Sequence, residues 1–245
     1  MKITMKHYYY FGRNSQAVGK NLLLPSSWDA IRTDDNQETP FSVPKERDKW
    51  VEKCRNHKSM ADRAMAITDF LKSQRSKYQR VNSFGVGGGF MEYNLKKNYP
   101  EILLNCSDFT PKTVQRLKEV FLEADNIEVF NMMNDRWVNS GSDTLYLLCR
   151  LDADFSNEQW DIIFRKIHQR GIENVLFVPC DVSTIRFLIR EKLGYFIQLL
   201  KGRKMTFAGY LRNKDQLKSL FEKYYNCVQE LPIADLTGFL LKIKK

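Results

Sequence analysis

The sequence predicts an α/β protein whose strands form a mostly parallel sheet, and three observations support this. Short apolar runs alternate along the chain with segments whose apolar residues recur every three or four positions. Four glycines fall within five positions between the first such run and the helical segment after it. The segment 143–150 is nearly all apolar, which is typical of a parallel strand covered on both faces.

The segment 81–110 carries the clearest motif. A short apolar run at 81–84 leads into Gly85, Gly87, Gly88 and Gly89, a helical stretch follows at 90–99, and a second apolar run at 102–106 ends close to Asp108. Such a unit places backbone N–H groups and a helix N-terminus beside a ligand. A carboxylate at the end of the second strand can accept hydrogen bonds from ribose hydroxyls. The pattern therefore predicts a nucleotide-like ligand.

The glycine spacing separates two cofactor classes. In the dinucleotide fingerprint G-x-G-x-x-G, the third glycine would fall on Phe90, whose ring opposes close helix–strand packing. The spacing present, G-x-G-x-G, together with the sequence CSDFTPKTV around Asp108, resembles the class I S-adenosylmethionine-dependent methyltransferases. The resemblance covers about residues 80–245. It implies a Rossmann-like seven-stranded, mostly parallel sheet with helices on both faces and an antiparallel last strand.

The resemblance also implies the cofactor, S-adenosyl-L-methionine, and the residues that bind it. The family carries an acidic residue two positions before the first glycine, where this chain has the uncharged Ser83. After the third strand, Met132 and Met133 suit the face of an adenine ring and Asn134 its edge, although core packing explains the methionines equally well. The implied cofactor-binding residues are Ser83, Gly85, Gly87, Gly89, Asp108, Phe109, Met133, Asn134 and Arg150.

The remaining elements follow in order. Pro111 suits the first turn of a helix, and a third strand is expected at 127–130. Ser156 and Gln159 form a capping-box pattern ahead of another helix, and a fifth strand is expected at 174–178. A helix from 213 or 214 to 225 then precedes strands at 227–231 and 236–243. The resemblance implies that the last strand runs antiparallel between the fifth and sixth.

Three regions are predicted along the chain. Residues 1–45 hold three of the seven prolines in their second half and predict an extended arm without regular structure. Its aromatic residues, Trp28 and those at 8–11, either contact a substrate or anchor the arm. Residues 46–79 predict a helical lead-in of two helices that meet at His57, and residues 80–245 form the cofactor-binding domain.

An insertion at 181–212 interrupts this domain. Residues 181–214 contain eight Lys or Arg against two acids, and apolar residues of the insertion form a helix-like stripe from Ile185 to Leu200. The pattern predicts a basic, amphipathic cover over the active site. Contact with a membrane surface, contact with a lipid-linked substrate and ordinary packing on the core remain open for the stripe.

Composition limits location and partners. The net charge of +10 favours anionic partners or is ordinary solubilising charge. No apolar run approaches the length of a membrane span, the first residues lack the apolar core of a signal peptide, and the five cysteines are scattered. We therefore expect a cytoplasmic protein. The three histidines show no ligand spacing, so no zinc site is expected.

The function predicted is methyl transfer from S-adenosylmethionine to an anionic acceptor, either small or lipid-linked. RNA methylation is an alternative that suits the charge, but the segment after the fourth strand is RLDAD, without the catalytic tetrapeptide of many nucleic-acid amino methyltransferases. A non-catalytic cofactor-binding protein is a second alternative, and a nicotinamide-dependent oxidoreductase is disfavoured by Phe90. Asp152, Asp154 and Tyr210 are candidates for orienting or deprotonating the acceptor.

Overall fold

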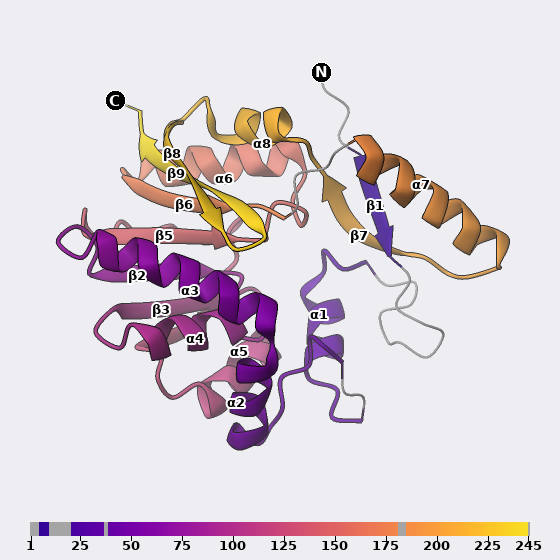
Figure 1. Ribbon diagram of the computed structural model, residues 1–245, viewed down its shortest axis with the longest axis horizontal. Coiled ribbons are helices and arrows are strands. Elements are labelled where there is room, and N and C mark those ends of the chain that lie inside the picture. Colours follow the sequence, from indigo (N-terminus) through magenta and orange to yellow (C-terminus); the bar gives the residue numbers. More distant parts are fainter. Residues whose placement is uncertain (1–4, 10–20, 37–38, 181–184, 245) are drawn as a thin grey trace.

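A computed structural model describes residues 5–9, 21–36, 39–180 and 185–244. Its centre is a seven-stranded sheet in the order β4-β3-β2-β5-β6-β9-β8, shown in Figure 1. Strands β4, β3, β2, β5 and β6 are parallel, and β9 runs antiparallel between β6 and β8. The strands are β2 (Arg80–Phe84), β3 (Leu103–Asp108), β4 (Asn126–Val129), β5 (Thr144–Cys149), β6 (Asn174–Val178), β8 (Tyr225–Ile233) and β9 (Leu236–Ile243). The predicted fold class, including the antiparallel last strand, is confirmed.

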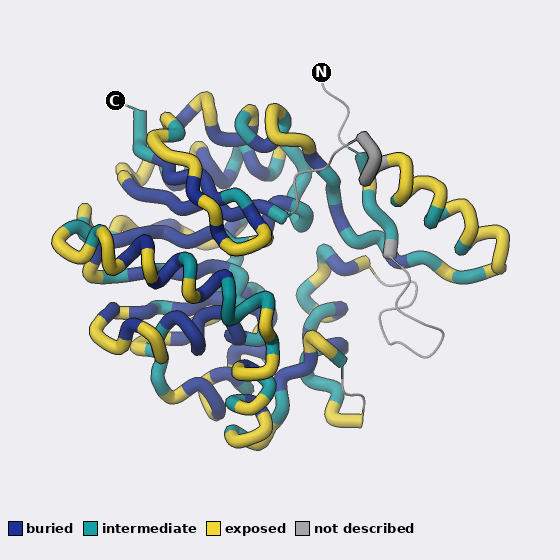
Figure 2. The backbone as a smooth tube through the Cα atoms, in the orientation of Figure 1, coloured by how far each residue is buried: buried dark blue, intermediate teal, exposed yellow. Residues whose placement is uncertain are grey.

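Helices cover both faces of this sheet, so the strands are buried (Figure 2). One face packs against α2 (Arg47–Asn56), α3 (Lys58–Ser73), α4 (Phe90–Asn98) and α5 (Pro111–Val120). The other face packs against α6 (Asn157–Gln169) and α8 (Lys214–Phe221). On β5, Leu145 and Leu147 face the first layer, and Tyr146 and Leu148 face the second. Burial on both sides is the reason that this strand is apolar throughout.

Several predicted boundaries are confirmed. The strands at 174–178 and 236–243 are β6 and β9, and the two lead-in helices, α2 and α3, meet at His57. The capping box at the start of α6 forms, because Ser156 accepts from the backbone of Gln159 and the Gln159 side chain accepts from that of Ser156. The helix predicted to reach Tyr225 ends instead at Phe221, because Tyr225 already pairs with Ile243 in the sheet.

The prediction of an arm without regular structure is wrong. The arm contains β1 (Met5–Tyr9) and α1 (Pro25–Arg32). Strand β1 pairs antiparallel with β7 (Thr206–Leu211) in a separate two-stranded sheet. The partner strand lies about two hundred positions away in the sequence, so the local pattern could not indicate the pairing. Residues 10 and 11 of the aromatic run lie outside the described residues.

The insertion at 181–212 contains two different elements, the helix α7 (Ile185–Leu200) and the strand β7. In Figure 1, α7 lies at the margin of the molecule beside β1, away from the central sheet. None of the helices in the described part of the chain has both the length and the apolar character needed to cross a bilayer.

Candidate cofactor site

The glycine turn joins β2 to α4 at the carboxyl edge of the sheet, where ligands of open α/β sheets bind. Gly85 and Gly87 have φ angles of 66° and 58°, in the left-handed region that favours glycine. A Cβ atom on Gly85 would lie 2.3 Å from Leu151 Cδ2, and one on Gly87 would lie 3.0 Å from Arg32 Nη2. Gly89 is the N-cap residue of α4. Side chains therefore lie directly against this turn.

Asp108 ends β3 beside the turn and is 1% exposed. Its Oδ2 accepts a hydrogen bond of 2.8 Å from the Gly87 backbone N–H. Its Oδ1 accepts one of 3.0 Å from the backbone N–H of Thr110, and the Thr110 hydroxyl donates to the same oxygen. The structure thus brings the predicted ribose-binding carboxylate and the glycine turn into direct contact. Phe109, the next residue, is half-buried.

Arg32 is part of this site, although it was not among the residues predicted from the sequence. Its Nη1 donates to Asp108 Oδ1 over 3.2 Å and to the Thr110 hydroxyl over 3.3 Å. The guanidinium also lies 4.5 Å from the centre of the Trp28 ring. The Trp28 ring therefore packs against Arg32, a residue of the same arm. No local pattern marks Arg32, because its partner Asp108 is 76 positions away.

Helix α1 is held in place by a second carboxylate. Asp29 is buried, and its Oδ1 accepts from both the backbone N–H and the hydroxyl of Thr113, each over 3.0 Å. Thr113 lies in the first turn of α5, where the backbone N–H groups lack partners within the helix. Asp29 therefore caps α5 from another segment, which fixes α1 beside the Asp108 carboxylate.

A third carboxylate lies under the glycine turn. Glu92, in the first turn of α4, is 3% exposed, and its Oε1 accepts a hydrogen bond of 2.8 Å from the Ser83 hydroxyl. Burial raises the pKa of Glu92 to about 7, and the nearby Asp108 adds to this effect. The residue that replaces the family's acid, Ser83, is thus bonded directly to an acid from the next helix. The sequence feature that could have indicated it is the acid at position 92, in the first turn of the helix that follows the glycines.

The loop after β5 forms the opposite side of the site. Arg150 has a positive φ of 59° and an exposed side chain, and Leu151 packs over Gly85. Asp152 is buried and accepts a hydrogen bond of 2.6 Å from the backbone of Cys180. This hydrogen bond connects the segment after β5 to the segment after β6, so the Asp152 carboxylate helps to hold the two strand ends together.

Asp154 is half-buried in the same loop. Burial, with smaller contributions from the charges of Asp152 and Asp108, raises its pKa to about 7 against the lowering effects of Arg32 and Arg150. A carboxyl group with such a pKa can exchange a proton near neutral pH.

Strand β7 lies against this loop. The backbone N–H of Tyr210 donates to the Ala153 carbonyl over 2.9 Å, and a Cβ on Gly209 would lie 2.1 Å from that oxygen. The buried Arg212 donates to the carbonyls of Asp152 and Phe155. The Tyr210 ring lies 5.5 Å from the Arg212 guanidinium. The insertion thus reaches the site through β7, whereas α7 does not cover it.

The residues after β4 divide between core and surface. Met132 is buried, and its carbonyl accepts from the Trp137 indole over 3.1 Å. Met133 is half-buried against the same cluster, and Asn134 is exposed. Among the described residues, no group of three or more His, Cys, Asp or Glu side chains is placed to hold a metal ion.

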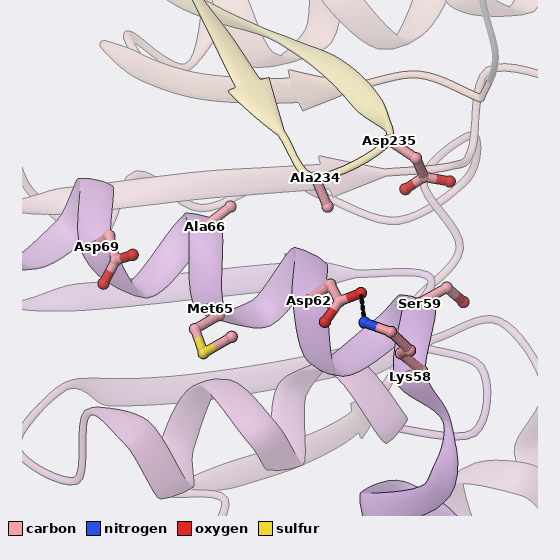
Figure 3. Close-up of a pocket in the computed structure, with 8 residues that line it drawn as sticks. All are labelled: Lys58, Ser59, Asp62, Met65, Ala66, Asp69, Ala234 and Asp235. Atoms are coloured by element: carbon pink, nitrogen blue, oxygen red, sulfur yellow. Dashed lines mark hydrogen bonds and ion pairs between the residues drawn. The ribbon is translucent and has the colours of Figure 1, made fainter.

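A surface depression lies elsewhere, between α3 and the turn that joins β8 to β9 (Figure 3). Its lining includes Asp62, which is paired with Lys58 over 2.8 Å, and Asp235, which is paired with Arg63 over 2.7 Å. The glycine turn and Asp108 do not line it. The side chains of Arg32 and Leu151 lie next to the turn itself.

Comparison with known proteins supports the fold. No family model matches the chain, and no curated protein sequence matches it significantly. Among solved structures, the chain is similar to the PH0226 protein from Pyrococcus horikoshii OT3, with 11% identity, a TM-score of 0.57, and coverage of 84% of this chain and 96% of that one.

Two further matches are methyltransferases. The human N-acetylserotonin methyltransferase, solved in complex with SAM, is 15% identical, with a TM-score of 0.51 and coverage of 90% of this chain and 67% of that one. The O-methyltransferase NcsB1 from neocarzinostatin biosynthesis, solved with S-adenosyl-L-homocysteine and 1,4-dihydroxy-2-naphthoic acid, is 15% identical, with a TM-score of 0.52 and coverage of 74% and 57%.

The chain spans 54% to 67% of the length of these two and several other matched proteins. It has the fold of the class I S-adenosylmethionine-dependent methyltransferases, as the resemblance implied.

The buried Glu92 carboxyl group makes a testable contribution to stability. Its folded-state pKa of about 7 exceeds the ordinary value of 4.5, so the wild type loses stability as the pH rises from about 4.5 to 7. Glu92→Gln keeps an oxygen that can accept from Ser83 but cannot ionise. At pH 8 we expect the variant to exceed the wild type in free energy of unfolding by on the order of 3 kcal/mol.

Urea unfolding at pH 4.5 and pH 8 measures this difference. The exposed Glu119→Gln on α5 is the control and should leave the pH dependence unchanged. Parallel pH profiles of the wild type and Glu92→Gln would contradict the assignment.

Proposed function

We propose that this protein is an S-adenosylmethionine-dependent methyltransferase. The observation that carries the proposal is the contact between the Asp108 carboxylate and the Gly87 N–H at the carboxyl edge of the sheet. The pair combines a buried acid for ribose hydroxyls with a turn whose backbone a ligand can approach. The fold shared with the methyltransferases supports the same cofactor.

The residues of the turn fit the parts of this cofactor. Asp108 would accept hydrogen bonds from the two ribose hydroxyls, and the turn with the N-terminus of α4 would lie along the methionine part. Arg32 and Leu151 occupy space next to the turn, so both side chains would move when the cofactor enters. Met133, Asn134, Phe109 and Arg150 are proposed to border the cofactor.

Replacing the ribose-binding acid tests the site. Asp108→Asn keeps the shape of the side chain and its acceptor oxygen but removes the charge. Charged hydrogen bonds contribute roughly 1.5–3 kcal/mol each, so we expect binding of S-adenosylhomocysteine to weaken at least about tenfold. Isothermal titration calorimetry measures the affinity, and Asp161→Asn on α6 is the control. Equal affinity of Asp108→Asn and the wild type for S-adenosylhomocysteine would rule out the proposed site.

We further propose that Glu92 replaces the acid missing at position 83. Its carboxylate is bonded to the Ser83 hydroxyl and lies close enough to Asp108 for their charges to interact. The family's acid helps to hold the methionine end of the cofactor, whose amino group is positively charged. An ammonium group favours the ionised form of a neighbouring carboxyl group. The charge would therefore come from α4 rather than from β2.

Removing the charge at position 92 and then placing one at position 83 tests this role. Glu92→Gln should weaken binding of S-adenosylhomocysteine at least about tenfold, because a charge-assisted hydrogen bond is lost. Binding of 5′-methylthioadenosine, which lacks the amino acid part, should stay within about twofold. Adding Ser83→Asp to Glu92→Gln should restore most of the affinity.

A comparison of the two ligands separates a role of Glu92 in cofactor binding from a role in the fold alone. An equal loss for both ligands, or no loss for either, would show that Glu92 serves only the fold. If the wild type binds neither ligand, the proposed function itself fails.

The acceptor is proposed to be an anionic hydroxyl compound, either small or lipid-linked. The bound cofactor supplies an electrophilic methyl group on a positively charged sulfur. For transfer of this methyl group, the hydroxyl of the acceptor would have to give its proton to a base supplied by the protein. Asp154 is proposed as this base because it lies in the loop beside Leu151 and has a pKa near 7. The net charge of +10 favours an anionic acceptor over a neutral one.

The compound 1,4-dihydroxy-2-naphthoic acid, with which NcsB1 was solved, combines a carboxylate with hydroxyls and is a suitable first probe. We expect its methylation rate to rise as the pH increases through about 7, where Asp154 becomes a base. Asp154→Asn should lower kcat by about a hundredfold or more and leave cofactor affinity within about twofold. Mass spectrometry of the methylated product measures the rate.

Unchanged kcat in Asp154→Asn would remove this residue from the mechanism. Cofactor binding without turnover of any hydroxyl acceptor in a panel would favour the second candidate, a non-catalytic cofactor-binding protein. The observation that favours this second candidate is the uncharged Ser83, at a position where the family has an acid.

A further inference from the structure

The helix α7 presents its apolar face to solvent. Five apolar side chains at helical spacing, described from Ile189 onward, are between 49% and 88% exposed: Ile189, Leu193, Phe196, Ile197 and Leu200. The opposite side of the helix faces β1. There, Glu191 is paired with His7 over 3.0 Å, and the Tyr195 ring lies 5.2 Å from that of Tyr8.

This orientation is the reverse of the usual one. An amphipathic helix of a globular protein normally turns its apolar stripe to the core and its polar side to water. Here the polar and aromatic side contacts β1, and the apolar stripe lies outside, so core packing, one of the three alternatives left open for the stripe, does not apply to its described part. The described part of the stripe runs from Ile189 to Leu200, which is about 18 Å along a helix, so it forms an extended patch. Contiguous apolar patches of this kind mark contact sites for a protein or a membrane.

The charges around the stripe indicate the kind of partner. Lys192, Lys201 and Lys204 are exposed on α7 and the turn after it, and Lys6 is exposed on β1. The only acid between residues 182 and 212 is Glu191, which faces His7. A second copy docked through the same face would bring like charges together. An anionic bilayer surface would instead accept both the apolar stripe and the cations.

We propose that α7 is a membrane-surface helix that lies flat on bilayers containing anionic lipid. Its apolar stripe enters the boundary between headgroups and acyl chains, and its lysines contact the headgroups. The β1–β7 sheet carries the helix, and β7 also contacts Ala153 in the loop of the candidate site. Membrane docking would therefore hold the site near the bilayer, where a lipid-linked acceptor would be found.

Flotation of the full chain with vesicles tests the proposal. The wild type should float with vesicles of phosphatidylcholine and phosphatidylserine at 7:3, and bind pure phosphatidylcholine at least tenfold more weakly. Leu193→Ser/Phe196→Ser/Leu200→Ser should lose at least tenfold in affinity for the anionic vesicles, with an unchanged far-UV circular dichroism spectrum. These residues are exposed, so the fold does not depend on them.

A pair of charge reversals separates a local contact from total charge. Lys201→Glu/Lys204→Glu should weaken binding at least tenfold and reduce its dependence on salt. The matched control, Lys97→Glu/Lys118→Glu, changes the net charge equally on exposed positions of other helices and should weaken binding less than threefold. If both double variants lost vesicle affinity equally, binding would depend on the net charge of the protein and not on α7, which would overturn the proposal.

Two further results would also overturn it. One is equal vesicle binding by the wild type and the apolar variant. The other is a wild-type dimer in sedimentation velocity that dissociates in the apolar variant, without vesicle binding by either, since the partner would then be a second copy.

Discussion

The Asp108 carboxylate is the group on which the candidate site depends. It is almost fully buried, and the backbone N–H groups of Gly87 and Thr110 together with the Arg32 guanidinium compensate for its charge. An isolated charge at this depth would be strongly unfavourable, so these partners stabilise the buried carboxylate in the free protein. They come from three parts of the chain: the turn after β2, the segment after β3, and the amino-terminal arm. The arm is therefore part of the site.

Two features show how acidic groups are distributed around this turn. Ser83 stands at the strand position where the family pattern that the sequence resembles has an acid, and its hydroxyl donates a hydrogen bond to the Glu92 carboxylate of α4. Glu92 and Asp108 interact unfavourably when both are ionised, and burial raises the pKa of Glu92. A positively charged ligand group would relieve both effects. The loss of stability that we expect for the free protein near neutral pH would fit a binding role, because functional sites commonly retain groups that are unfavourable for folding alone.

The insertion after β6 links the site to the surface. Arg212 and the backbone of β7 hold the loop that contains Asp152 and Asp154, so the loop's geometry depends on a strand outside the central sheet. The same strand pairs with β1, which in turn supports α7. A helix with an exposed apolar face and a loop with a titratable carboxyl group are therefore connected through one small sheet. This arrangement gives the insertion a structural role that its basic composition alone did not indicate.

Local patterns in the sequence determined most strands of the central sheet, the glycine turn and the position of Asp108, whereas the antiparallel placement of the last strand followed from the resemblance to a family. Apolar runs define buried parallel strands, glycines at 85 and 87 supply positive φ angles, and Asp108 directly follows its strand. Only the tertiary structure decided that residues 5–9 form a strand, that Arg32 meets Asp108, that Glu92 meets Ser83, and that the α7 stripe faces water. The physical reason is that helical spacing shows which residues share a face but not what covers that face. Likewise, an ion pair or a strand pairing between distant segments depends on packing that no local window contains.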